Sequence, residues 1–223
     1  MEYTDAFVAF CKGNLDLNGE HYSAPYESLP ACLIDCIYSL QSKYFSVTVP
    51  VVERYAERFM QGDRFAAGDT LRSFVEQVDG AGGAVAFASA VLRNRQRLSG
   101  RSKAEVCYDL AKKLLSLGIN TKEDFQARTD VEVLEAVIRS VRGVGSAAMN
   151  YLFMLAGDPD RCKPDVHIHH CVRDALGRDL SDDDCQRLLA SAVSELKAEY
   201  PHLYVARLDS IIWQKYQIGN KKK

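Results

Sequence analysis

Residues 138–152 read IRSVRGVGSAAMNYL, and this stretch is the most informative one for the fold. The apolar residues before its glycines recur with helical spacing at Val133, Leu134, Val137, Ile138 and Val141. A second apolar run of helical length, residues 147–156, follows the glycines. The pattern therefore predicts two antiparallel helices joined by a tight turn of the glycine–apolar–glycine type at residues 142–146.

This turn offers a way to bind phosphate without a cationic side chain. Gly143 and Gly145 permit a tight turn that leaves backbone amides exposed at the start of the second helix. Such amides, with the helix dipole behind them, attract anions. The net charge of the chain is −2, which argues against a protein that holds nucleic acid by bulk charge. Backbone dipoles at the turn would allow the protein to bind nucleic acid without a net positive charge.

Helical signals continue on both sides of the turn. Helical spacing predicts further helices over residues 30–40, 51–59, 71–78, 84–92 and 103–117. Asp165 and Ser181 stand where helix N-caps are expected, and Gly177 stands where a helix should end. A last helix is predicted over residues 203–213. Residues 45–49 form the only strand-like run, so the predicted fold class is all-α.

The composition is that of a globular chain. Its 223 residues are 47% hydrophobic, which is enough to bury a core in one large domain or two small ones. The longest uncharged run, residues 143–157, is shorter than the roughly 20 residues that span a bilayer. Glu2 and Asp5 precede any apolar run, unlike the start of a signal peptide. We therefore expect an intracellular protein of the cytoplasm, nucleoid or nucleus, without a membrane partner.

Cysteine and histidine patterns give little support to a metal site. The seven cysteines are scattered and no C-x-x-C pair occurs. Cys32 and Cys36 lie one helical turn apart in an apolar pattern, so we predict that both are buried thiols. His167, His169 and His170 are close in sequence, but His169 falls on a different helical face, and the nearest further candidates beside His167 and His170 are Cys171 and Asp174. No metal held by side chains is expected.

Beyond the turn, residues 163–168 read KPDVHI. The order of a helix, a G-V-G hairpin, a helix, and then D-x-H-[VI] at the start of another helix resembles the helix-hairpin-helix superfamily of DNA glycosylases, the endonuclease III-like enzymes of base excision. Residues 39–42 (SLQS) and 102–104 (SKA) resemble segments that precede the hairpin in that family, and 208–213 (LDSIIW) matches more loosely. The similarity covers roughly residues 27–177.

The resemblance implies an architecture. Members of the family are all-α, with two helical subdomains and a DNA-binding cleft between them. Residues 26–160 would form a helical barrel that carries the hairpin, and residues 1–25 together with 161–223 would form the second subdomain. The implied partner is double-stranded DNA, bound by a monomer.

The resemblance also implies a chemistry, which is hydrolysis of the N-glycosidic bond of a damaged or mispaired base flipped out of the duplex. The essential aspartate of the family falls on Asp165, whose carboxylate would stabilise the oxocarbenium-like sugar as the base leaves. Without the resemblance, Asp165 is an ordinary helix N-cap. The two roles are compatible, because a capping aspartate can still present an oxygen to the cleft.

DNA-contacting residues are assigned by their position in the family. The hairpin would hold backbone phosphate, with a monovalent cation, K⁺ or Na⁺, at the main-chain carbonyls of Arg142 and Val144. Gln41 would fill the gap left in the duplex, although a surface glutamine at a helix end is an equal alternative, and Lys163 would contact phosphate. The expected DNA-binding set is Gly143, Val144, Gly145, Ser146, Gln41 and Lys163. The basic run 93–113 would add contacts, although alone it reads as solvated surface.

A flipped base needs aromatic faces to stack on. The candidates for a base pocket are Tyr38, Tyr44, Phe45, Tyr151 and Trp213. Aromatic residues at helical spacing are more often part of a core, so we expect only one or two of these to meet a base.

Departures from the family pattern narrow the expected activity. Ala147 stands where bifunctional members carry a Schiff-base lysine, so no β-lyase step is expected. No cysteine follows Cys185, so no iron–sulfur cluster is expected, and Arg142 replaces a usual proline. These features favour a monofunctional DNA glycosylase, a hydrolase of N-glycosyl bonds that needs no cofactor. The alternatives are a helix-hairpin-helix protein that binds damaged or distorted DNA without catalysis, and an all-α protein–protein module.

Overall fold

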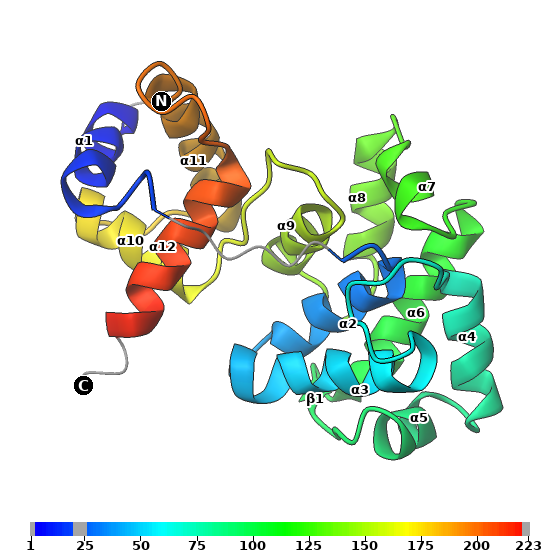
Figure 1. The fold of residues 1–223 in the computed structure, drawn as a ribbon. Coiled ribbons are helices and arrows are strands. Elements are labelled where there is room, and N and C mark those ends of the chain that lie inside the picture. The colour runs from blue at the N-terminus through cyan, green and yellow to red at the C-terminus, as the bar shows by residue number, and fades with distance from the viewer. Residues whose placement is uncertain (1–2, 20–25, 220–223) are drawn as a thin grey trace. The chain divides into compact units, whose positions relative to one another are not determined.

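The structure of the protein, a computed structural model, describes residues 3–19 and 26–219 and is helical almost throughout, which confirms the all-α class (Figure 1). The chain forms two compact units, one of Ala24–Gly157 and one of Met1–Ser23 with Asp158–Lys223. Each unit has a buried apolar cluster of its own. Among the described residues, no helix combines the length and the apolar character needed to cross a membrane.

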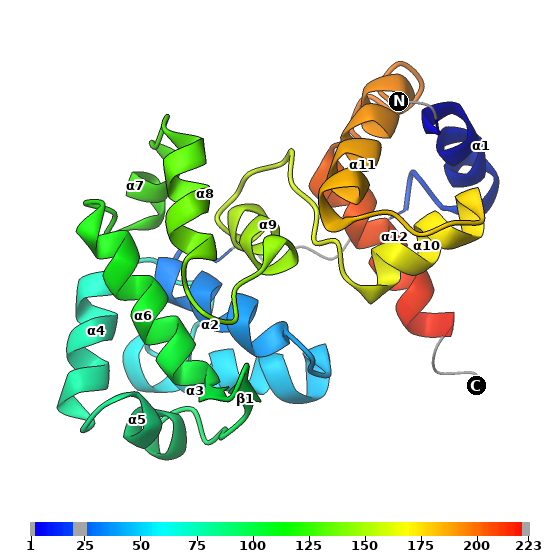
Figure 2. The same cartoon turned by 180° about the vertical axis from the view of Figure 1, so that it is seen from behind.

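The unit Ala24–Gly157 carries most of the helices. Its elements are α2 (Leu29–Ser39), the π-helical turn η1 (Tyr44–Thr48), α3 (Val49–Phe59), α4 (Leu71–Gly80), α5 (Ala84–Ala90), β1 (Arg97–Leu98), β2 (Arg101–Ser102), α6 (Lys103–Ser116), α7 (Lys122–Gln126), α8 (Val131–Arg139) and α9 (Ser146–Leu155). The two short strands pair in antiparallel fashion. Helix α2 lies at the centre, packed against α3, α6 and α9 (Figures 1 and 2).

Helix α2 is the core of this unit, and all eleven of its residues are buried. It begins where Ser28 caps it, with Oγ accepting a hydrogen bond from the Ala31 amide at 3.1 Å. Pro30 falls in the first turn, where its missing N–H is no loss. The apolar positions of the sequence pattern thus predict a helix that the structure confirms.

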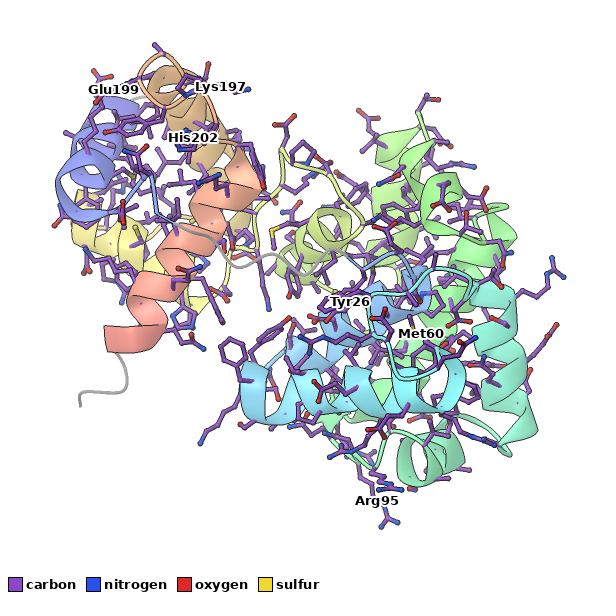
Figure 3. The ribbon with its side chains drawn as sticks, viewed as in Figure 1. Tyr26, Met60, Arg95, Lys197, Glu199 and His202 are labelled. Atoms are coloured by element: carbon purple, nitrogen blue, oxygen red, sulfur yellow. The ribbon has the colours of Figure 1, made fainter. Side chains whose placement is uncertain are left out.

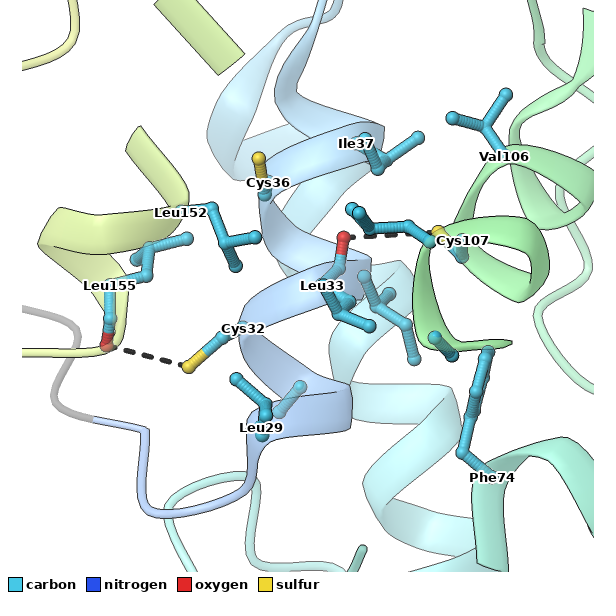
Figure 4. Close-up of a cluster of buried hydrophobic side chains, with 14 of the residues drawn as sticks. Leu29, Cys32, Leu33, Cys36, Ile37, Phe74, Val106, Cys107, Leu152 and Leu155 are labelled. Atoms are coloured by element: carbon cyan, nitrogen blue, oxygen red, sulfur yellow. Dashed lines mark hydrogen bonds between the residues drawn. The ribbon is translucent and has the colours of Figure 1, made fainter. Parts of the chain in front are cut away.

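The cysteines of this unit serve as small core residues. Cys32 and Cys36 are buried, as predicted, and their thiols donate to the carbonyls of Leu155 and Ala148 at 3.4 and 3.1 Å. Cys107 of α6 donates to the carbonyl of Leu33 at 3.8 Å (Figure 4). These bonds join α2 to α6 and α9.

The strand-like run at residues 45–49 does not form a strand. Its first four residues belong to η1, in which the amides of Val47 and Thr48 donate to the carbonyl of Lys43 at 3.0 and 3.4 Å, and Val49 begins α3. Pro50 lies in the first turn of α3 and extends the helical path. Spacing alone does not distinguish a strand from a helix in a short β-branched run. The strands of the described elements, β1 and β2, pair with each other and not with residues 45–49.

The other unit is built from both ends of the chain. It holds α1 (Thr4–Asn14), α10 (Val166–Leu176), α11 (Asp182–Leu196) and α12 (Val205–Gly219). Helix α1 packs on α10 and α11, and α12 packs on the same two helices. The predicted helix ends are confirmed here: Asp165 caps α10, Gly177 ends it with φ 68°, and Ser181 Oγ accepts from the Asp184 amide at 3.2 Å.

Candidate nucleic-acid interface

The predicted turn joins α8 to α9 through residues 140–145. Val141 and Val144 are buried and anchor the turn in the core, and the Val144 amide donates to the Val141 carbonyl at 3.0 Å. Gly143 has φ 101°, a backbone conformation that favours glycine, whereas Gly145 is extended. No side chain in the described parts of the chain is seen to cap the N-terminus of α9, where Gly145 is the N-cap residue, so its first amides keep their capacity to bind an acceptor.

The tip of the β1–β2 hairpin lies against this turn. A Cβ added at Gly143 would lie 3.2 Å from two carbons of the Leu98 side chain and 3.6 Å from Ser99 Oγ. One added at Gly100 would lie 3.9 Å from an Arg142 nitrogen. We call this contact region, residues 97–101 with 142–146, the turn–hairpin surface.

Two arginines give the turn–hairpin surface its charge. Arg97 and Arg142 are exposed, and the guanidinium of Arg97 donates to the carbonyl of Gly100 at the hairpin tip. Arg101 is paired with Asp109 at 2.6 Å, so its charge is largely neutralised. Arg95, which precedes β1 in the chain, is exposed to solvent (Figure 3). The turn–hairpin surface thus includes both exposed cationic side chains and the uncapped start of α9.

The basic run 93–113 is expected to add contacts with DNA, and for Lys103 this expectation is wrong. This side chain is 1% exposed, and its Nζ donates to the carbonyls of Tyr38 and Leu40 at 3.1 and 2.6 Å. A third bond joins Nζ to Gln96 Oε1 at 3.1 Å. The ammonium therefore binds carbonyls at the C-terminal end of α2, where the helix dipole favours a cation.

Gln41 follows the end of α2 and lies on the surface of the same unit. It has φ 52°, uncommon for a residue with a side chain. Ser42 beside it accepts a hydrogen bond from Gln96 Nε2 at 3.4 Å. The segment that contains Gln41 is thus held in a defined, strained conformation.

The candidate base-stacking aromatics differ in their burial. Tyr38 is fully buried in the core, which contradicts its assignment to a base pocket because no base can reach its ring. Tyr151 is 7% exposed and donates to Asp35 at 2.8 Å, so it too is a core residue. Tyr44 and Trp213 are half-buried, in different units. Phe45 is the most accessible of the five, with half of its side chain exposed.

Asp165, the predicted catalytic carboxylate, is in the unit built from the chain ends. Its Oδ1 accepts from the amides of His167 and Ile168 at 2.8 and 3.4 Å, so the predicted N-cap role is confirmed. No hydrogen bond from the part of the chain that the structure describes reaches Oδ2, and the side chain is half-buried. Oδ1 thus caps α10, whereas Oδ2 remains able to accept a hydrogen bond or to interact with a positive charge.

A second carboxylate, that of Asp209, was not among the site residues predicted from the sequence. It lies on α12, is 6% exposed, and accepts a hydrogen bond from the Lys163 amide at 2.7 Å. Burial, together with the negative charge of Asp165, raises the pKa of Asp209 to about 8. Asp209 shares a helical face with Val205 and Ile212, and an acidic residue on such an apolar face is the signal that would have revealed it.

Lys163 and His167 flank Asp165 and are tied to it locally. The Lys163 carbonyl accepts from the Asp165 amide at 2.6 Å, while its side chain is half-buried. Burial lowers the pKa of His167, against the opposing charge of Asp165. Its buried Nδ1 has no hydrogen-bond partner among the described residues. The segment 163–167 therefore brings a lysine and an imidazole close to Asp165, and its Lys163 amide binds Asp209 of α12.

Comparison with known proteins adds membership of a family. No curated protein and no solved structure matches the chain. One family, described as a domain of unknown function (DUF8548), matches residues 5–217 and thus spans both units. The chain belongs to this DUF8548 family.

Proposed function

We propose that this protein is a monofunctional DNA glycosylase that hydrolyses the N-glycosidic bond of a damaged or mispaired base. The observation that carries the proposal is the turn–hairpin surface, which holds the uncapped start of α9 together with exposed Arg97 and Arg142. Amides at a helix start bind phosphate oxygens, and arginine adds bidentate contacts. The α8–turn–α9 unit is then a helix-hairpin-helix that holds the DNA backbone.

A monovalent cation fits the same turn. Among the described residues, no backbone hydrogen bond ends on the carbonyl oxygens of Arg142 or Val144. These two oxygens would hold K⁺ or Na⁺, which would supply positive charge next to a phosphate.

Asp165 is the proposed catalytic residue. As the bond between the base and C1′ breaks, the base takes the electron pair and the sugar becomes positive, so a nearby carboxylate lowers the barrier. Oδ1 of Asp165 stays on the α10 amides, which fixes the side chain, while Oδ2 faces the developing charge. Water then adds to C1′ and loses a proton, and the departing base anion gains one, so the products are the neutral base and an abasic sugar. Ala147 offers no amine where bifunctional helix-hairpin-helix glycosylases carry their Schiff-base lysine, so the product keeps an intact abasic sugar.

The second candidate function is recognition of damaged or distorted DNA without catalysis. Arg142 and Ala147 favour this candidate, because helix-hairpin-helix glycosylases usually carry a proline at the first position and, in bifunctional members, a lysine at the second. Both candidates predict DNA binding, and only the first predicts base release.

Single-turnover base release separates the two candidates. Labelled duplexes would carry uracil, thymine opposite guanine, 3-methyladenine, 8-oxoguanine or hypoxanthine, and each would be analysed with and without hot alkali. We expect alkali-dependent cleavage of at least one duplex, and a loss of about 100-fold or more in Asp165→Asn. Asparagine still caps a helix, so binding and folding should persist. Asp183→Asn, which makes the same substitution at an exposed aspartate in the first turn of α11, is the control.

The binding half of the experiment uses salt. Arg142→Ala should weaken binding to every duplex and lower the slope of log K against log salt by about one, because one phosphate contact is lost. Arg72→Ala removes an exposed arginine on α4 and serves as the control. Binding without release from any duplex would favour the non-catalytic candidate. Equal slopes in wild type, Arg142→Ala and Arg72→Ala would remove the turn–hairpin surface as the DNA contact.

A further inference from the structure

A carboxylate is buried at the centre of the unit Ala24–Gly157, and three tyrosines donate hydrogen bonds to it. Asp35, in the middle of α2, is fully buried. Its Oδ2 accepts from the hydroxyls of Tyr26 and Tyr44, and its Oδ1 accepts from that of Tyr151, each at 2.8 Å. We call Asp35 and these three tyrosines the tyrosine cluster.

Stability alone does not account for such a cluster. Placing a carboxylate in a core has a large desolvation cost, and three phenol donors offset it only in part. Apolar side chains of similar volume often give equal or greater stability at such a site. A fully connected polar cluster does, however, hold its members in one arrangement, because any displaced partner leaves a buried group unsatisfied.

The members of the cluster differ in what they are attached to. Tyr26 is fully buried and stacks on Phe65 at 5.7 Å, and Tyr151 lies within α9. Tyr44 is half-buried and begins η1, the strained turn at the surface. The bond from Tyr44 to Asp35 therefore fastens a surface element to the core.

The residues around Tyr44 form an exposed segment that is attached to the core by hydrogen bonds of Asp35 and Lys103. Residues 41–47, which we call the surface segment, include exposed Gln41 and Lys43 as well as half-exposed Phe45, whose ring meets that of Tyr44 edge-on at 5.4 Å. Lys103 binds the carbonyl just before this segment. A π-helical turn and a residue with positive φ are unfavourable conformations that persist where the surrounding structure enforces them, often at functional sites.

We propose that Asp35, acting through Tyr44, is a positioning residue that holds the surface segment so that Phe45 presents its ring to an unstacked DNA base. A base offers a flat π-face that stacks on an exposed aromatic ring, and Lys43 beside it suits the nearby phosphate. The surface segment belongs to the same unit as the turn–hairpin surface. The contact with DNA rests on the function proposed above, whereas the positioning of the segment by Asp35 is measurable without DNA.

Two tyrosine variants test the proposal, because Tyr44 and Tyr26 donate to the same oxygen of Asp35. Hydrogen exchange read by mass spectrometry would follow peptides that cover residues 41–48. We expect Tyr44→Phe to raise exchange there by about tenfold, the loss of one hydrogen bond to a charged group. Tyr26→Phe, the matched control, should lower the melting temperature at least as much and leave exchange of this segment unchanged.

DNA contact is measured with a duplex that contains 2-aminopurine, whose fluorescence rises when the base unstacks. Tyr44→Phe and Phe45→Ala should both lose about tenfold in affinity and most of the fluorescence rise, while Tyr26→Phe keeps both. Equal exchange in Tyr44→Phe and wild type would overturn the positioning role. Equal losses of affinity in Tyr44→Phe and Tyr26→Phe would overturn it as well, since a general loss of stability would then be the cause.

The two proposals fail in distinguishable ways. If the wild type binds no duplex, the proposed function falls and the base contact of Phe45 falls with it, whereas the exchange data still decide whether Asp35 positions the segment. If the wild type binds and Phe45→Ala binds equally well, the base contact of Phe45 is wrong and the proposed function stands.

Discussion

At the scale of the residue, Asp209 is the side chain whose chemistry the tertiary structure changes most clearly. Its carboxyl group is buried next to Asp165, which disfavours a second negative charge and raises its pKa to about 8. The bond from the Lys163 amide favours the charged form and offsets part of this effect. Asp209 therefore holds a proton at neutral pH while it anchors the segment that leads into Asp165.

This raised pKa predicts a pH-dependent stability. In the unfolded chain Asp209 loses its proton near pH 4, and in the folded protein only near pH 8. The folded state thus binds the extra proton between these values, so its contribution to stability is full below about pH 4 and is lost as the pH rises through 8. Asp209→Asn cannot titrate, although its side-chain oxygen still accepts from Lys163. Relative to wild type, this variant should gain about 3 kcal/mol in unfolding free energy between pH 5 and pH 8.

Urea unfolding at pH 5, 6.5 and 8 would measure that difference. The comparison between the two proteins cancels the titration of all other groups. If the two stability curves run parallel across this range, Asp209 has an ordinary pKa and is ionised in the folded protein.

At the scale of the element, the two glycines of the α8–α9 turn have different roles. Gly143 combines φ 101° with a Cβ position only 3.2 Å from Leu98, whereas Gly145 is extended and has nothing within 4 Å of its Cβ position. Gly143 is thus required by backbone conformation and by the close approach of the β1–β2 hairpin, while Gly145 is required by neither.

This difference predicts unequal effects of alanine. Gly143→Ala should cost about 2 kcal/mol or more, because it adds backbone strain and a close contact. Gly145→Ala should cost less than about 1 kcal/mol, the usual effect of a weaker N-cap. Thermal and urea unfolding of both variants would measure these costs, and equal costs would contradict the close packing of hairpin and turn.

At the scale of the whole molecule, the chain builds two separate cores. One lies within Ala24–Gly157, and the other joins α1 to α10, α11 and α12 across the full length of the sequence. Phe7 of α1 is fully buried in the second core. The N-terminal helix is therefore part of the structure that supports Asp165 and Asp209.

A core substitution in one unit should act within that unit. Phe7→Ala removes a buried aromatic ring and should cost about 3–5 kcal/mol. Native-state hydrogen exchange should rise in α10, α11 and α12 and stay unchanged in α2 and α6. Phe74→Ala, which removes a ring from the other core, should show the reverse pattern. Equal changes in both units after either substitution would show that the two cores unfold together.

Sequence reasoning succeeded where the physics is local. Apolar spacing, capping residues and a terminal glycine depend on neighbours within a few positions, so α2, α8, α9 and α10 could be predicted from the sequence. Asp165 could be recognised as an N-cap for the same reason. The strand-like pattern of residues 45–49 did not reveal their helical structure, because short β-branched runs take their conformation from the residues that pack against them.

The all-α class, the positions of most helices and the turn between α8 and α9 could be predicted from the amino-acid sequence, because each depends on local spacing and backbone freedom. The burial of polar groups and the identity of their partners could not be predicted in this way. In the folded protein, Lys103 binds the carbonyls at the end of α2 and three tyrosines donate to Asp35. Asp209 lies close enough to Asp165 for the two charges to interact. Burial and charge proximity depend on contacts between residues far apart in the chain, and one sequence does not reveal those contacts.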